Sequence, residues 1–135
     1  EPDVNAGKSN KLLNKLINEN LSNLKKMDEL SEEYSREKHY ICQQFRNCVE
    51  KSVEEFLIGE VVMRFRKDVQ TKRIKYLHTI TKEDCNIVDD MMTKYSSYNH
   101  SMSSETPLIE FDISEIEEDM NKFSQWQRER KALVK

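Results

Sequence analysis

Large apolar residues recur along the first half of the chain at the spacing of an α-helix. Between Leu13 and Phe56 they lie about 3.6 residues apart on average, allowing one polar step near Glu37 and Lys38, whereas a strict coiled coil repeats at about 3.5. The positions are Leu13, Ile17, Leu21, Leu24, Met27, Leu30, Tyr34, Ile41, Phe45, Val49, Val53 and Phe56. We expect Leu24, Leu30 and Phe45 to lie along a helix–helix seam.

No proline occurs between residues 3 and 106, so one helix, or a nearly continuous pair, is predicted from about residue 10 to about residue 78. At about 1.5 Å per residue it would be roughly 100 Å long, more than the width of a compact domain of 135 residues. The helix therefore either breaks or makes the molecule elongated. The stripe is weakest between Leu30 and Ile41. Gly59 is the other candidate break, although its apolar neighbours favour a close helix contact there.

The most apolar stretch runs from Phe56 to Phe65, where seven of ten residues are large and apolar. Apolar side chains on all sides of a helix indicate burial against more than one neighbour. We expect at least two other elements to cover this stretch, supplied by the C-terminal part of the chain or by a partner. The predicted interface core is Phe56, Leu57, Val61, Val62 and Phe65.

Shorter elements are predicted after the first helical region. Thr81, with Asp84 three residues later, resembles a capping box and marks the start of a further helix. Residues 96–107 are rich in serine and end in proline, as expected of a linker. The predicted organisation is a lead-in at 1–9, a main helical region at 10–95, a linker at 96–107, and an extended segment plus C-terminal helix at 108–135.

Residues 108–113 alternate between apolar and polar and are followed by several acids. The apolar set, Ile109, Phe111 and Ile113, is the best candidate for a linear recognition element that adds to the edge of a partner's sheet. Packing of these three side chains along the protein's own bundle is the favoured alternative.

The last helix, from about residue 115, is expected to return against residues 56–65. It carries Ile116, Met120, Phe123, Gln127 and Arg130 at helical spacing. Trp126 is either an interface anchor or packs at the end of the bundle, and the second is favoured.

Composition supports a helical fold. Two glycines and two prolines are few for a chain of this length, and sheet proteins use both residues in frequent turns. A charged fraction of 35% with a hydrophobic fraction of 36% suits a thin bundle, which exposes much surface for each buried residue. The predicted class is all-α: an elongated, coiled-coil-like helical bundle with a long N-terminal helix, or a broken pair, and shorter C-terminal helices.

Charge is unevenly distributed. Residues 64–75 carry six positive charges and one negative, and residues 105–119 carry seven negative charges and no positive one, within a net charge of −3. Pairing or solvation of these stretches is favoured over a surface that contacts nucleic acid or anionic lipid. The residues of this basic surface are Arg64, Arg66, Lys67, Lys72, Arg73 and Lys75.

Motifs for catalysis or metal binding are lacking. The sequence contains no glycine-rich phosphate loop, Gly-x-Ser-x-Gly or His-Glu-x-x-His. His39 and Cys42 are one turn apart, but structural zinc needs a second close pair. We expect no enzyme activity, cofactor or metal. Three cysteines make no disulfide framework, and neither a membrane span nor a signal peptide is visible, so the cytoplasm or nucleus is expected.

The sequence favours a structural or adaptor subunit that acts by helix–helix association in a homodimer or a heteromeric complex. Burying each large apolar side chain along such a seam contributes about 1.5 to 3 kcal/mol, so strong assembly is expected. The alternative is binding of nucleic acid or an anionic membrane surface through residues 64–75. A third interpretation is a compact monomeric four-helix domain of signalling type.

Overall fold

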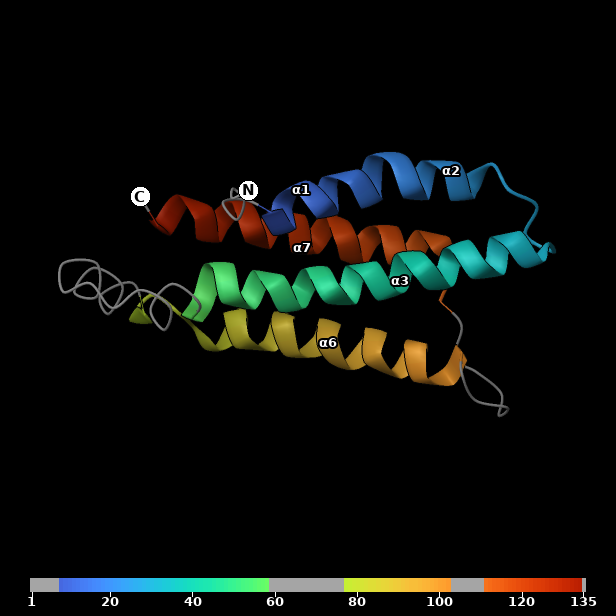
Figure 1. Ribbon diagram of the computed structural model, residues 1–135. Helices are drawn as coiled ribbons and strands as arrows, with labels where there is room; N and C mark the ends of the chain where they lie inside the picture. The colour runs from blue at the N-terminus through green and yellow to red at the C-terminus, as the bar shows by residue number, and fades with distance from the viewer. Residues whose placement is uncertain (1–7, 59–76, 103–110, 135) are drawn as a thin grey trace.

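Helical rods of alternating direction make up the part of the chain that the computed structural model describes, residues 8–58, 77–102 and 111–134 (Figure 1). The first rod contains α1 (Lys8–Lys15), a π-helical turn η1 (Leu16–Asn20) and α2 (Leu21–Lys25). The second contains α3 (Glu32–Val53) and a π turn η2 (Glu54–Ile58), and the last two are α6 (Lys82–Met102) and α7 (Ile113–Val134). The described ranges contain no strand, so the all-α prediction is confirmed.

The long N-terminal helix is a broken pair, with a turn at residues 26–31 between the first two rods. The Ser31 hydroxyl caps α3 by accepting a hydrogen bond from the Tyr34 backbone N–H at 3.1 Å. Glu32 and Glu33 place negative charge in the first turn of α3, where the helix dipole favours it. The local sequence therefore starts a new helix at this point.

The prediction that Leu30 lies along the seam is wrong. Its side chain is 95% exposed because it falls within the turn. The backbone leaves the helix at Lys26, and beyond that residue the apolar spacing no longer measures rotation about one helix axis. The turn starts before the weakest part of the stripe and overlaps only its first residues.

The π turn η1 changes which residues of the first rod reach the core. A regular helix would bring Leu13, Ile17 and Leu21 to one face. Instead Leu16 is buried and Ile17 is only partly buried. Leu21 N–H donates to Leu16 C=O, the wider bond of a π turn, which accommodates about one extra residue. Leu16 and Leu21 are five residues apart, one more than a regular helix allows on one face. The extra residue in the π turn lets both side chains face the core together with Leu24.

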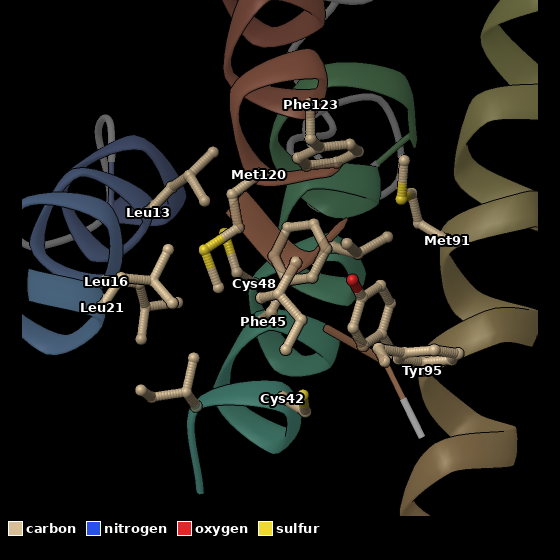
Figure 2. Packing of buried hydrophobic residues seen from close by; sticks show 14 of the residues in the cluster. Leu13, Leu16, Leu21, Cys42, Phe45, Cys48, Met91, Tyr95, Met120 and Phe123 are labelled. Carbon is tan, nitrogen blue, oxygen red and sulfur yellow. The ribbon is translucent and has the colours of Figure 1, made fainter. Parts of the chain in front are cut away.

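Side chains from every rod meet around Phe45 of α3 (Figure 2). The Phe45 ring centroid lies 4.9 Å from that of Tyr95 on α6 and 5.9 Å from that of Phe123 on α7, both edge to face. Leucines of the first rod, including Leu13, close the other side. Leu24 and Phe45, predicted to lie along a seam, are therefore buried within one chain.

α7 returns against the end of the second rod, as predicted, and the contact is made within the chain. The Trp126 ring centroid lies 6.1 Å from that of Phe56 and 5.0 Å from that of Phe123. Trp126, Phe56 and Leu57 are all buried. The remaining predicted interface residues lie outside the described residues: Val61, Val62 and Phe65.

Phe111 and Ile113, the described members of the predicted recognition element, pack on the bundle. Phe111 is buried, and its ring centroid lies 5.4 Å from that of Tyr95. The Lys94 ammonium lies 4.9 Å from the Phe111 ring centroid. Ile113 begins α7 and is partly buried against the core, whereas Ile109 lies outside the described residues. The placement of Phe111 agrees with packing along the bundle and corrects its assignment to an exposed recognition element.

Candidate functional site

α6 begins with the capping box expected from the sequence. Thr81 N–H donates to Asp84 Oδ2 at 2.8 Å, and Asp84 N–H donates to Thr81 Oγ1 at 3.1 Å. This reciprocal pair satisfies two of the N–H groups that the first turn of a helix leaves without partners.

The Asp84 carboxylate also holds α7. Oδ1 accepts from Trp126 Nε1 at 2.9 Å, and Oδ2 accepts from Arg130 Nη1 at 3.1 Å. The same guanidinium donates to Thr79 O and Thr79 Oγ1, both at 3.1 Å. Arg130 is only 2% exposed, so its charge is balanced in the interior rather than in water.

The environment of Asp84 keeps it ionised. Burial by itself raises the pKa of this carboxyl, but the hydrogen bonds from Thr81 and Trp126 and the charge of Arg130 outweigh that effect. The pKa of Asp84 therefore lies below its ordinary value. An ionised carboxylate opposite a buried guanidinium is a stable structural pair at neutral pH.

A second polar contact joins the same helices about three turns further along α6. Lys94 Nζ lies 2.5 Å from Glu115 Oε2 and 2.8 Å from Asp119 Oδ2, and the Tyr95 hydroxyl donates to Asp119 Oδ2 at 2.6 Å. Burial lowers the pKa of Lys94, but the bonds and charges of the two acids raise it above its ordinary value. Burial and the bond to Asp119 raise the pKa of Tyr95.

These contacts place one flank of α6 beside one flank of α7, and we call the two rows of residues along those flanks the α6–α7 face. Within each row the residues recur every three or four positions, which places them on one side of a helix. The row along α6, with Ile80 just before it, is Ile80, Glu83, Ile87, Asp90 and Lys94. The row along α7 is Glu115, Asp119, Lys122, Trp126, Glu129 and Leu133.

α6 carries three apolar residues that the bundle covers only in part. Met91 and Tyr95 are buried, whereas Ile87, Val88 and Met92 are only partly buried against the core. Ile87 lies on one flank of the buried residues, while Val88 and Met92 lie toward the other. The apolar stripe of α6 therefore extends past the core on both sides.

Gln127 ties the opposite side of α7 to the first two rods. Its Nε2 donates to Ser9 Oγ at 3.2 Å and to Ser52 Oγ at 2.9 Å, while Ser9 Oγ donates to Glu55 Oε1 at 2.6 Å. Gln127 is 1% exposed, and among the described residues its Oε1 has no hydrogen-bond partner. This buried polar layer fixes how α7 sits against α1 and α3.

The thiols and possible metal ligands do not form a reactive centre in the described ranges. Burial raises the pKa of both Cys42 and Cys48 to about 12, so little thiolate is present at neutral pH. Cys85 is exposed on the first turn of α6. Across 8–58, 77–102 and 111–134, no three His, Cys, Asp or Glu side chains group as a metal site would require.

The sequence placed Arg130 and Gln127 on the apolar stripe of the last helix but predicted no partner for either. Both share the helical spacing of apolar residues on the last helix, and a polar residue at such a position signals a buried polar contact. Asp84 was identified only as a cap. The predicted basic surface lies outside the described residues: Arg64, Arg66, Lys67, Lys72, Arg73 and Lys75.

Comparisons with protein-family models, curated proteins and solved structures find no match for this chain. Among the described residues, no helix combines the length and the apolar character needed to cross a membrane. Function is therefore inferred from the fold and from the α6–α7 face.

Proposed function

We propose that the chain is a protein-interaction subunit, a scaffold or adaptor that acts by helix–helix association in a homodimer or a heteromeric complex. The observation that carries the proposal is the apolar stripe of α6, which the bundle covers only in part. The outer side of a bundle helix is normally polar, and apolar side chains at its edge mark contact with another protein. Ile87, Val88 and Met92 are such side chains.

The anchoring of α6 supports the same proposal. Asp84 and Lys94 bind α7, and Arg46 Nε of α3 donates to Ser96 Oγ at 2.7 Å on the other flank. A helix held at several points is already ordered before a partner arrives. Binding to a preordered surface loses less conformational entropy than binding to a mobile one.

Site-specific photo-cross-linking in the full chain tests the proposal. A photoreactive phenylalanine derivative replaces Asn86 or Thr93, which are exposed on α6, and matched substitutions are made at Asn14 on α1 and Asn47 on α3. We expect one discrete adduct, with another protein or a second copy, from the α6 positions in cells of the native source. If no position on any rod gives an adduct, the proposed function fails. If only positions on α1 or α3 give an adduct, the protein is still an interaction subunit, but its binding surface is not on α6.

A reducing compartment, the cytoplasm or the nucleus, is part of the proposal. The three cysteines of the chain are all free thiols, and two of them are buried. Disulfides persist in oxidising compartments and are rare in the cytosol and nucleus. Fractionation of the native cells, with antibody detection of the full chain, tests the compartment.

A further inference from the structure

The α6–α7 face combines apolar side chains with an excess of acids. Ile80 and Ile87 pack against the core but remain partly exposed, and Leu133 is 51% exposed at the far end of α7. Trp126 of the same α7 row is buried and donates to Asp84 of α6. A row of separated apolar contacts at helical spacing is what an amphipathic helix requires of its binding surface.

The charges of this face have one dominant sign. Five acids belong to its two rows and only two cations, Lys94 and Lys122. Lys94 pairs with both Glu115 and Asp119, which leaves that cluster with one net negative charge, and the two rows together carry a net charge of −3. Glu83, Asp90 and Glu129 are exposed and carry negative charge along both edges.

We infer that the α6–α7 face binds an amphipathic helix of a partner protein whose apolar stripe is flanked by lysine or arginine. Apolar residues of that helix lie over Ile80, Ile87 and Leu133, and its cations lie over Asp90 and Glu129. Complementary charge at the rim selects the partner and its direction, while the apolar stripe supplies most of the affinity. This inference rests on the proposed function and names the partner's chemistry.

A model helix provides the probe. A labelled peptide of about 18 residues, roughly five helical turns, carries leucines at positions i, i+3, i+4 and i+7 and lysines elsewhere. One control peptide replaces every lysine with glutamate. Another keeps the leucine and lysine composition but scrambles the spacing. Binding to the full chain is followed by fluorescence anisotropy of the label and by the emission of Trp126, the only tryptophan.

Matched protein variants locate the binding surface. Asp90→Lys with Glu129→Lys reverses two charges on the α6–α7 face. Glu29→Lys with Glu54→Lys makes the same change in net charge at exposed positions on the turn and on η2. Ile87→Gln removes an apolar contact on the face, and Leu30→Gln removes an exposed leucine elsewhere.

We expect the leucine–lysine peptide to bind the unsubstituted protein. Reversing Asp90 and Glu129 weakens binding by about tenfold or more, whereas reversing Glu29 and Glu54 changes it by less than about twofold. Ile87→Gln weakens binding and Leu30→Gln does not. Equal binding by both charge-reversed variants overturns the inference, as does equal binding of the glutamate peptide or the scrambled one.

The two proposals fail in different ways. If the peptide does not bind but cross-links form from another rod, the protein is an interaction subunit and the α6–α7 face is not its surface. If cross-links form only with a second copy of this chain, the interaction function stands and the inferred partner is wrong. If no cross-link forms at all, the proposed function itself fails.

Discussion

At the scale of single residues, Asp84 serves two structural purposes with one carboxylate. It caps α6 through Thr81 and anchors α7 through Trp126 and Arg130. Because Arg130 is buried, its ion pair with Asp84 is made in the interior and not in water. The position of α7 relative to the start of α6 therefore depends on a charge and not on packing alone.

Asp84→Asn tests this dependence. Asparagine keeps an oxygen to accept from Trp126 but removes the negative charge opposite Arg130. Losing a hydrogen bond between charged groups costs about 1.5 to 3 kcal/mol, so we expect the free energy of unfolding in urea at neutral pH to fall by about that amount. Glu83→Gln, at the exposed neighbouring position, is the control and should change it by less than about 0.5 kcal/mol. Equal losses in both variants would contradict the role of the buried pair.

The pH dependence of stability has a defined sign. The pKa of Asp84 is lower in the folded protein than in the unfolded chain. Such a group contributes stability above its unfolded pKa, and that contribution disappears as the pH falls through the folded pKa. We expect the free energy of unfolding to fall as the pH drops from about 5 to about 2, and to fall less in Asp84→Asn. If the unsubstituted protein and Asp84→Asn show the same dependence of unfolding free energy on pH, other carboxylates cause the loss of stability in acid.

The three thiols should differ in reactivity. Cys42 and Cys48 are buried with pKa values of about 12, so at pH about 8 only about one molecule in ten thousand carries the thiolate at either site. Cys85 is exposed. A colorimetric disulfide reagent should therefore modify one thiol per native chain rapidly and all three after denaturation. A fast phase that persists in Cys85→Ser would show that a buried thiol becomes accessible.

Local contacts could be predicted from the sequence at this scale, and distant ones could not. The Thr81–Asp84 cap was predictable because its partners are three residues apart and the backbone of a helix start brings them together. Trp126 and Arg130 lie 42 and 46 residues from Asp84. The spacing on the last helix turns Arg130 inward, but no local signal names the carboxylate that it meets.

At the scale of the helical elements, apolar spacing predicted the rods but not every residue that faces the core. The π turn η1 inserts one residue, so Leu16 takes the place in the core expected for Ile17. The turn at residues 26–31 contains Met27 and Leu30 at helical spacing although the helix has ended. Both differences come from backbone geometry, which the side-chain pattern does not report.

Removing one residue from η1 should restore a regular helix. Deleting Asn18, which is exposed, leaves Leu13, Leu16, Leu21 and Leu24 separated by three, four and three residues, the spacing of an uninterrupted α-helix. We expect the variant to keep its helical circular dichroism and to remain within about 1 kcal/mol of the parent in the free energy of unfolding. Urea denaturation measures both quantities.

Deleting Asn47 is the matched control, because it is an exposed asparagine in the regular helix α3. The deletion rotates the following residues by about 100°, which turns Val49 and Phe56 out of the core. Each displaced large side chain costs about 1.5 to 3 kcal/mol, so this variant should lose most of its cooperative unfolding. If both deletions lower the free energy of unfolding equally, η1 does not hold a residue that the first rod can lose.

At the scale of the whole molecule, the rods lie side by side within one chain (Figure 1), and buried apolar residues from every rod form one core. Asn20 Nδ2 donates to Glu37 between the first two rods, and Lys25 pairs with Glu117 of α7 at 2.9 Å. The sequence predicted an all-α bundle and the return of the last helix. It did not predict whether the same chain or a partner covers the apolar residues. An apolar stripe shows that a helix surface is buried, but not which chain buries it.

Because one chain supplies the whole described core, its thermal stability should not depend on protein concentration. An obligate dimer gains about 2.7 kcal/mol per dimer for each hundredfold rise in concentration, which would raise the thermal midpoint of a pair of chains this size by roughly 5 °C. We expect the midpoint of this protein to stay constant over such a range, because Phe45 and its neighbours are covered by the chain's own helices. Phe45→Asp should correspondingly abolish the helical circular dichroism and not merely halve the mass seen by light scattering. A midpoint that rises with concentration would mean that a second copy completes the core, whereas a constant midpoint leaves association to surfaces outside it, such as the edges of α6.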